Sequence, residues 1–237
     1  MTTLTLAQRS DLSDLRSTFT QNRRVQIPHL LLDESALKIY RTLEKQSSWN
    51  LAWNYNGQHK DMDYGGVQAW TDSEKQQLDA LIHEQAAHQF QYRYAAIPIY
   101  DIYQQNLMPN HFFNQIYEFV NSNAVLELAR KVTGFNDIKF ADIQATRYSK
   151  GHFLTMHDDA VEGKNRLAAY VINLTPNWKV DWGGALIFPN SDSGAAAWFP
   201  EFNVLNLFAV PQKHAVSVVS PFAPTDRYSL TGWFRRK

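Results

Sequence analysis

The sequence predicts an α+β fold: a double-stranded β-helix, or jelly roll, with an N-terminal helical half packed on one of its sheets. Two observations predict it. Residues 1–134 show mainly helical spacing of apolar residues, and residues 135–237 show short apolar runs between glycine- and proline-containing turns. Many short strands after a run of helices are typical of a jelly roll covered by helices on one face. With 237 residues, 44% of them hydrophobic, the chain is expected to form a single domain, 1–237.

The first helices and the first extended segment have recognisable signals. Apolar residues follow near-helical spacing from Leu4 to Thr20. The segment Val25–Pro28 is expected to be extended, because the residue before a proline is pushed out of the helical region. Asp33 is expected to cap the N-terminus of a helix that runs through Leu43.

A capping box marks the start of the longest expected helix. Thr71 and Glu74 have the spacing at which side chain and backbone satisfy each other's hydrogen bonds, and helical periodicity continues beyond them. Two further helices are expected at 110–121 and 124–133. The second is expected to end at Gly134, since glycine readily adopts the left-handed conformation of a helix terminus.

The remaining segments divide into expected loops and expected strands. Residues 49–64 and 98–109 are rich in aromatic side chains without a clear period, and both are expected to be loops near the mouth of a site. The expected strands are 140–148, 153–157, 167–174, 185–188, 204–210, 215–219 and 228–234.

Composition excludes several classes of protein. The 23 basic and 23 acidic residues cancel, so direct binding to nucleic acid or to an anionic membrane surface is not expected. The chain has no cysteine, which excludes disulfides and thiolate metal sites, so a metal must bind histidine and oxygen ligands. We find no signal peptide and no membrane span, and expect a cytoplasmic protein. The sequence leaves the oligomeric state open.

Three residues form a candidate metal site: His157, Asp159 and His214. In an extended strand, His157 and Asp159 would point to the same face, because side chains repeat every second residue. Two imidazoles and one carboxylate are the ligands of non-haem Fe(II) oxygenases, which leave coordination positions open for a co-substrate and O2. Taken alone, a His-x-Asp pair is common, and His214 would be an ordinary histidine at a strand start. The neighbouring Asp158 would point away and is rejected as a ligand.

Three further residues are candidates for binding a co-substrate. Arg227 is suited to the distal carboxylate of a dicarboxylic acid such as 2-oxoglutarate, although most arginines are surface ion-pair partners. Ser229 would lie on the same strand face as Arg227. Tyr148 would place its hydroxyl near the carboxylate, the alternative being a tyrosine of the core or rim.

At these positions the chain resembles a known family. The motifs that carry the resemblance are His157-Asp158-Asp159, Leu167–Leu174, Trp182–Leu186, His214 and Arg227–Phe234. They are similar to motifs of the Fe(II)- and 2-oxoglutarate-dependent oxygenases of the prolyl 4-hydroxylase superfamily, most of all to its ribosomal prolyl hydroxylase branch. The resemblance covers Val25 to Phe234. Eukaryotic members of that branch carry a second jelly-roll domain, of which no counterpart is expected here.

The resemblance implies an activity and a role for each candidate residue. His157, Asp159 and His214 would bind Fe(II) and form the catalytic centre, while Arg227, Tyr148 and Ser229 would bind 2-oxoglutarate as co-substrate. O2 would be the oxidant, and ascorbate is a candidate reductant. The implied reaction is hydroxylation of a prolyl residue in a protein or peptide, with residues 49–64 forming part of the substrate groove.

Alternative functions differ in what the site binds. One alternative keeps the oxygenase chemistry but takes a free amino acid or another small metabolite. A second is a non-catalytic jelly-roll module that holds a metal ion. The retained pair Arg227 and Ser229 argues against this module, which would not need to bind a dicarboxylate. A zinc hydrolase is disfavoured further, because no helix-borne His-Glu-x-x-His motif lies near these ligands.

Overall fold

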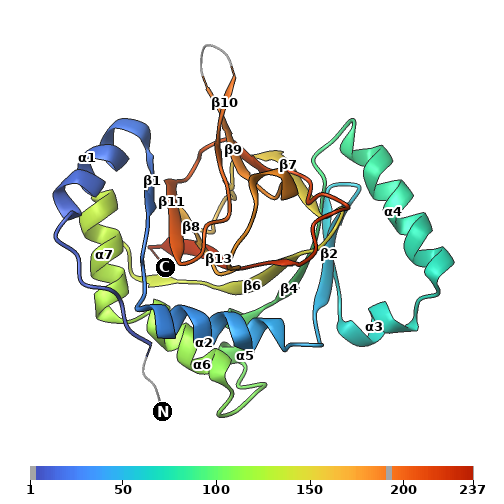
Figure 1. Cartoon of the computed structure of the whole chain (residues 1–237), viewed down its shortest axis with the longest axis horizontal. Coiled ribbons are helices and arrows are strands. Elements are labelled where there is room, and N and C mark those ends of the chain that lie inside the picture. The colour runs from blue at the N-terminus through green and yellow to red at the C-terminus, as the bar shows by residue number, and fades with distance from the viewer. Residues whose placement is uncertain (1–3, 191–193, 237) are drawn as a thin grey trace.

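The computed structural model describes residues 4–190 and 194–236, in which a curled antiparallel sheet is surrounded by helices (Figure 1). Its strands are β1 (Arg24–Ile27), β2 (Asn50–Tyr55), β3 (Gln58–Met62), β4 (Tyr92–Ile97), β5 (Phe140–Ala141), β6 (Gln144–Tyr148), β7 (Phe153–His157), β8 (Arg166–Asn173), β9 (Leu186–Pro189), β10 (Ala195–Trp198), β11 (Val204–Ala209), β12 (His214–Val216) and β13 (Arg227–Arg235). Its helices are α1 (Leu12–Asn22), α2 (Asp33–Glu44), α3 (Tyr64–Ala69), α4 (Asp72–Ala86), α5 (Ile99–Gln104), α6 (Phe112–Val120) and α7 (Asn123–Thr133), with a 3₁₀ turn at Val180–Trp182.

The strand order confirms the expected jelly roll. Neighbouring strands pair in the order β1–β11–β8–β13–β6–β4–β7–β12–β9–β10, β2 joins β4 and β3, and β5 joins β13. The longest strand, β13, pairs with β8 along one edge and with β6 and β5 along the other. The sheet curls so that β7, β12 and β9 face β8 and β13 across its interior (Figure 1). Residues distant in sequence therefore line one cavity.

Most helices pack on the outer face of this sheet, as expected. Side chains of α1, α2, α6 and α7 share one hydrophobic core with β1, β8, β11 and β13. The amphipathic faces of these helices account for the packing: α7 buries Leu126, Ala129 and Val132, which recur every three residues. No helix in the described ranges 4–190 and 194–236 is long and apolar enough to cross a membrane.

The β2–β3 hairpin, α3 and α4 form a separate projection at the side of the barrel (Figure 1). They pack around their own cluster, in which Trp53, Ile82 and Phe153 are buried. The capping box of α4 is present: Glu74 N–H donates to the Thr71 hydroxyl, and Thr71 N–H donates to the Glu74 carboxylate. This helix is the longest described, as predicted.

Several sequence-based expectations about local structure were wrong. Residues 49–64 form the β2–β3 hairpin rather than a loop, and its turn is Asn56-Gly57, both with positive φ. An Asn-Gly pair is a hairpin signal, because both turn residues must adopt φ values that asparagine and glycine tolerate. Residues 98–109 contain α5 instead of a continuous loop, and the expectations also missed β4 and β10.

Element boundaries differ from the expected ones at many elements, including the expected strand 215–219, which is observed as β12, His214–Val216. The first helix covers Leu12–Asn22 rather than the segment from Leu4, and Leu6 instead pairs with Leu31 in an isolated bridge. Asp33 is the first residue of α2, and the capping position is Leu32, which makes no side-chain cap. The expected strand 140–148 is divided into β5 and β6. Gly134 ends α7 in the left-handed conformation, as expected.

Candidate metal and dicarboxylate site

The interior of the curled sheet contains a cavity of about 420 Å³. Its wall combines side chains from β4, β6, β7, β8, β12 and β13 with the turn after β7. Five of the six candidate residues line it: Tyr148, His157, Asp159, His214 and Arg227. Ser229 is not among the lining residues. The cavity therefore brings the candidate metal ligands and the candidate dicarboxylate ligand into one space.

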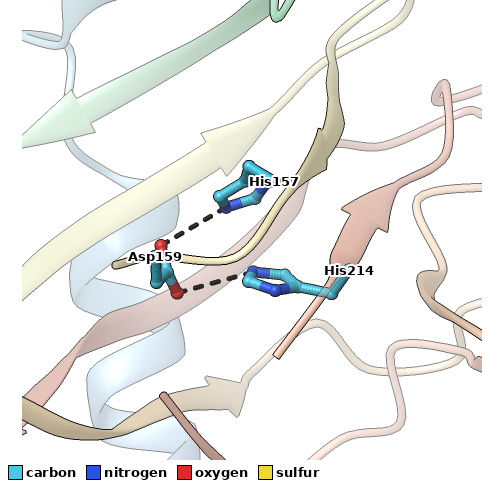
Figure 2. A group of neighbouring side chains, drawn as sticks. All are labelled: His157, Asp159 and His214. Atoms are coloured by element: carbon cyan, nitrogen blue, oxygen red, sulfur yellow. Dashed lines mark ion pairs between the residues drawn. The ribbon is translucent and has the colours of Figure 1, made fainter. Parts of the chain in front are cut away.

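His157, Asp159 and His214 converge on one point (Figure 2). The Nε2 atom of His157 lies 3.3 Å from Asp159 Oδ1, and the Nε2 atom of His214 lies 3.5 Å from Asp159 Oδ2. One ligand atom from each residue can be chosen so that all lie within 4.8 Å of one another. These separations allow two nitrogens and one oxygen to bind a single metal ion, and this donor set fits Fe(II) with open positions.

Backbone carbonyls orient both imidazoles. His157 Nδ1 lies 3.0 Å from the carbonyl oxygen of Thr155, and His214 Nδ1 lies 2.8 Å from that of Gln212. A carbonyl can only accept, so each Nδ1 carries the proton and donates it. The lone pair of each Nε2 is then directed at the metal position, as in metal sites where a second hydrogen bond fixes the tautomer of the ligand.

The strand periodicity that the spacing of His157 and Asp159 suggested does not account for the position of Asp159 in the site. Strand β7 ends at His157, and Asp159 has φ +63°, so the two residues do not share one face of a continuous strand. The turn itself directs the carboxylate toward the histidines. Asp158 lies outside the convergent group, and its Oδ1 accepts a hydrogen bond from the backbone N–H of Ala160. Asp159 thus faces the two histidines because its backbone is left-handed and lies within an Asx turn formed by Asp158, and not because of strand periodicity.

Electrostatics favour the deprotonated ligand set. Burial acts to raise the pKa of Asp159, but the interactions of its carboxylate with His157 and His214 outweigh it, so its pKa lies below the usual value. Burial lowers the pKa of His214, against the opposing effect of Asp159. Both shifts favour the forms that bind metal: a carboxylate and a neutral imidazole.

Arg227 is a buried cation that has no carboxylate partner in the part of the chain that the structure describes. It is 2% exposed, and its pKa is lowered by burial. Within the described residues, its guanidinium makes one hydrogen bond, from Nη2 to Asn173 Oδ1 at 3.2 Å, and its buried Nε has no partner. An uncompensated buried charge is unfavourable unless a ligand pairs with it. The donor fork thus fits the carboxylate of an acid bound in the cavity.

Tyr148 and Ser229 lie in different environments beside Arg227. Tyr148 is opposite Arg227 in the β6–β13 register, and the centre of its ring lies 5.2 Å from the guanidinium carbon. Ser229 is fully buried, and its hydroxyl lies 2.8 Å from Thr146 Oγ1. Thr146 lines the cavity whereas Ser229 does not, so direct contact between Ser229 and a co-substrate stays a prediction.

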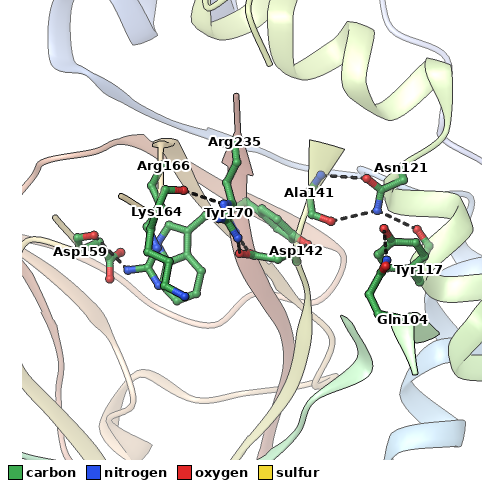
Figure 3. Close-up of polar contacts among 11 residues, drawn as sticks. Gln104, Tyr117, Asn121, Ala141, Asp142, Asp159, Lys164, Arg166, Tyr170 and Arg235 are labelled. Atoms are coloured by element: carbon green, nitrogen blue, oxygen red, sulfur yellow. Dashed lines mark hydrogen bonds and ion pairs between the residues drawn. The ribbon is translucent and has the colours of Figure 1, made fainter. Parts of the chain in front are cut away.

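A polar network behind the metal position was not identified from the sequence (Figure 3). Arg166 donates from Nη1 to the backbone carbonyl of Asp159 at 3.0 Å, and its guanidinium carbon lies 3.5 Å from the centre of the Trp233 ring. Asp142 accepts from the backbone N–H of Trp233 at 2.7 Å and from Arg235 Nη1 at 3.1 Å. Burial raises the pKa of Asp142. This network supports the turn that carries Asp159.

Aromatic rings of Phe90, of Tyr92 and Tyr94 in β4 and of Tyr148 in β6 form a continuous row along the cavity wall, from an exposed ring to a buried one. The centres of Phe90 and Tyr92 lie 5.4 Å apart, those of Tyr92 and Tyr94 5.5 Å, and those of Tyr94 and Tyr148 5.4 Å. Phe90 is 42% exposed, whereas Tyr148 is buried. His59 adds a ring stacked on Tyr92 and is the part of segment 49–64 that lines the cavity. The alternate spacing along 90–94 is the signal that the sequence offered for this row.

Comparison with known proteins supports the oxygenase resemblance. Residues 143–235 match the family model of the 2OG-Fe(II) oxygenase superfamily, and this span contains all six candidate site residues. The chain is 32% identical over 112 residues to prolyl 3-hydroxylase OGFOD1 of Mus musculus. That alignment covers 44% of this chain and 20% of the relative, so the chain spans about a fifth of that protein's length.

Solved structures with the same fold include two bacterial proteins. A Pseudomonas putida prolyl-4-hydroxylase aligns with a TM-score of 0.61 and 17% identity, over 95% of this chain and 100% of that chain. A 2OG-Fe(II) oxygenase family oxidoreductase from Burkholderia pseudomallei aligns with a TM-score of 0.63 and 12% identity, over 100% and 97% of the two chains. At these identities the likeness concerns the fold, and it agrees with the jelly roll expected from the sequence.

Proposed function

We propose that this chain, a member of the 2OG-Fe(II) oxygenase superfamily, is an Fe(II)- and 2-oxoglutarate-dependent dioxygenase that hydroxylates a prolyl residue in a protein or peptide. One observation carries the proposal: the convergent set His157, Asp159 and His214 shares a single cavity with Arg227, a buried cation that has no carboxylate partner among the described residues. A metal-binding module without catalytic function has no use for such a cation. The domain that we assign to this activity is 1–237.

Each residue has a defined part in this activity. His157, Asp159 and His214 would hold Fe(II), and Arg227 would hold the distal carboxylate of 2-oxoglutarate, with Tyr148 beside it. When bound, iron, 2-oxoglutarate and O2 supply the oxidising chemistry. The protein contributes placement: the carbonyls behind the histidines fix their orientation, and the aromatic walls of the cavity exclude water from the reacting atoms.

A peptide substrate is favoured over a free amino acid by the aromatic row that starts at Phe90. The row continues along the cavity wall to an exposed ring, so a substrate longer than a single amino acid would have a surface to contact. Aromatic surfaces bind proline-containing segments because their rings pack against pyrrolidine rings and such segments are already extended. OGFOD1 and the P. putida enzyme are prolyl hydroxylases by name, which agrees with this choice.

The class of reaction is tested first without a substrate. Anaerobic addition of Fe(II) and 2-oxoglutarate to the metal-free protein should produce the weak visible charge-transfer band of 2-oxoglutarate chelated to ferrous iron. The band should be absent in His214→Ala. Bound metal without any such band in the wild type would favour the non-catalytic module.

The substrate class is tested by mass spectrometry and by one surface variant. Proline-containing peptides should gain the mass of one oxygen atom, with stoichiometric loss of 2-oxoglutarate, and free proline should not. Phe90→Ala should raise the KM for a peptide by roughly tenfold, since an aromatic ring that the bound peptide buries contributes about 1.5 kcal/mol or more. The control is Phe222→Ala, which removes a 65% exposed ring outside the cavity. Turnover of a free amino acid, with no peptide modified, would support the small-molecule alternative.

A further inference from the structure

Asn173 is the one protein group that accepts a hydrogen bond from the guanidinium of Arg227 within the described residues. It is the last residue of β8 and is fully buried. On one side it faces Ser229 of β13, and on the other it faces Val204 of β11. Its side chain thus lies in the middle of the sheet, directly beside the base of the candidate dicarboxylate site.

The orientation of the Asn173 amide is determined by its two contacts. Its Nδ2 donates to the backbone carbonyl of Val204 at 3.3 Å, and its Oδ1 accepts from Arg227 Nη2 at 3.2 Å. A carbonyl cannot donate and a guanidinium cannot accept, so the reverse amide orientation would lose both bonds. The β11 carbonyl therefore orients the amide so that Asn173 presents its side-chain oxygen to Arg227.

Other contacts restrain the Arg227 side chain without supplying a negative charge. The ring of Tyr148 lies beside the guanidinium carbon at 5.2 Å. Gly184 lies so close to the stem that a Cβ atom there would be 3.2 Å from Arg227 Cδ. The remaining guanidinium edge, including the unpartnered Nε, has no protein acceptor in the described residues. The fork is held in place while its charge stays uncompensated.

We propose that Asn173 is a positioning residue for the co-substrate: its neutral amide orients the Arg227 fork and leaves the full positive charge for the distal carboxylate of 2-oxoglutarate. An aspartate at this position would have nearly the same shape but would form an internal ion pair with Arg227. A bound dicarboxylate would then approach a pair without net charge. The inference rests on the proposed function for the identity of the ligand, but the contact between the two side chains does not.

The substitution N173D tests this inference because it should change stability and ligand affinity in opposite directions. Pairing the buried cation should raise the Tm of the metal-free protein by more than the loss of the Asn173 Nδ2 hydrogen bond to the Val204 carbonyl lowers it. The same pairing should raise the Kd of 2-oxoglutarate, titrated anaerobically into the Fe(II)-loaded protein, by about tenfold or more. Fe(II) affinity, measured separately, should stay within about twofold of the wild type, because the triad is untouched.

Two further variants separate positioning from packing. N173L removes the acceptor and leaves Arg227 Nη2 unpaired, so it should lower the Tm and also raise the Kd of 2-oxoglutarate. N206D is the matched control. Asn206 is 1% exposed on the neighbouring strand β11, and its Oδ1 accepts from Gln26 Nε2, with no contact to Arg227. This control should lower the Tm and leave the Kd unchanged.

The outcomes decide between this inference and the proposed function. Unchanged 2-oxoglutarate affinity in N173D, or an equal loss of affinity in N206D, would overturn the inference. If the Fe(II)-loaded wild type binds no 2-oxoglutarate, the proposed function fails. The Tm of metal-free N173D then still tests the contact between residues 173 and 227. A Tm above that of the wild type supports an uncompensated Arg227 oriented by Asn173. A Tm at or below that of the wild type overturns the inference.

Discussion

His157 and His214 lie directly opposite each other in the β7–β12 register, and the centres of their imidazole rings are 4.1 Å apart. One interstrand pair thus supplies both candidate nitrogen ligands, while Asp159 completes the group from the turn after β7. The geometry of the site depends on the register of two strands as much as on the identity of the ligands. A slip by one residue would turn one imidazole to the opposite face.

The first prediction separates the two adjacent aspartates. Asp159→Ala should weaken Fe(II) binding by more than about 100-fold, because even groups that only orient a ligand commonly contribute 10–100-fold. Asp158→Ala should retain Fe(II), since its carboxylate accepts from Ala160 N–H and lies outside the convergent group. Metal content after dialysis, together with an Fe(II) titration, measures both. Equal loss in the two variants would show that the turn as a whole, rather than the Asp159 carboxylate, holds the metal.

The second prediction concerns the dicarboxylate site. Arg227→Gln should weaken 2-oxoglutarate binding by roughly 30-fold or more, as expected when one partner of a buried charge pair is removed at a cost of about 2–5 kcal/mol. Fe(II) affinity should be retained. The same titration of Fe(II)-loaded protein measures the first quantity, and metal content measures the second. Wild-type affinity for 2-oxoglutarate in this variant would mean that the acid binds elsewhere.

The third prediction concerns Gly232, the glycine in the run Arg227–Phe234. A Cβ atom at Gly232 would overlap the backbone carbonyl oxygen of Asp142 and would lie 2.9 Å from the Tyr170 hydroxyl. Gly232→Ala should therefore destabilise the fold by about 3 kcal/mol, since the backbone cannot move away as a side chain could. Urea denaturation measures the change. In the control Gly65→Ala, the added methyl meets only Asp63 Oδ1 at 3.4 Å, and stability should change by less than about 1 kcal/mol.

The fourth prediction concerns acid stability. Burial lowers the pKa of His152 to about 3, and the charge of Arg93 acts in the same direction. In the unfolded chain its pKa is about 6.5, so between these values only the unfolded state binds the proton. Stability should then be full above pH ~6.5 and should fall by up to about 1.4 kcal/mol per pH unit toward pH 3.

His152→Asn tests that contribution. Asparagine can replace Nδ1 as the acceptor for the Ser149 N–H, a hydrogen bond of 3.1 Å, but it does not titrate. The free energy of unfolding should consequently decline less steeply below pH ~6.5 in this variant than in the wild type. His88→Asn, a change at an exposed residue, should keep the wild-type slope. Identical slopes for all three proteins would assign the acid sensitivity to other groups.

The sequence predicted the strand-rich half more accurately than the helical half. Strand β7 was predicted with the observed bounds, and the helix ended by Gly134 began within one residue of the expected position. Both elements have strong local signals. The β2–β3 hairpin was missed because β3 is polar, with His59, Lys60 and Asp61, and the local hairpin signal Asn56-Gly57 was not used.

Within the site, the candidate ligands could be proposed from the sequence, but their environment could not. Arg166, Trp233 and Asp142 come from separate strands or turns, and no local spacing relates them. Asn173 appeared only as a residue of an apolar strand, because its importance depends on a neighbour fifty-four positions away in the chain. Contacts of this kind require the register of β8 and β13, which the amino-acid pattern alone does not fix.

The three candidate ligands come from β7, the turn after it and β12. Because they converge only in the folded protein, iron would affect the abundance of the protein in the cell. An unfolded or partly folded chain does not present three convergent ligands, so iron would bind the folded protein alone. Mass action then stabilises the native state, by about 2.7 kcal/mol when free metal exceeds its Kd 100-fold. When iron is scarce, a larger fraction of molecules would open and be degraded by proteases. The abundance of the protein, and not its turnover alone, would follow the iron supply.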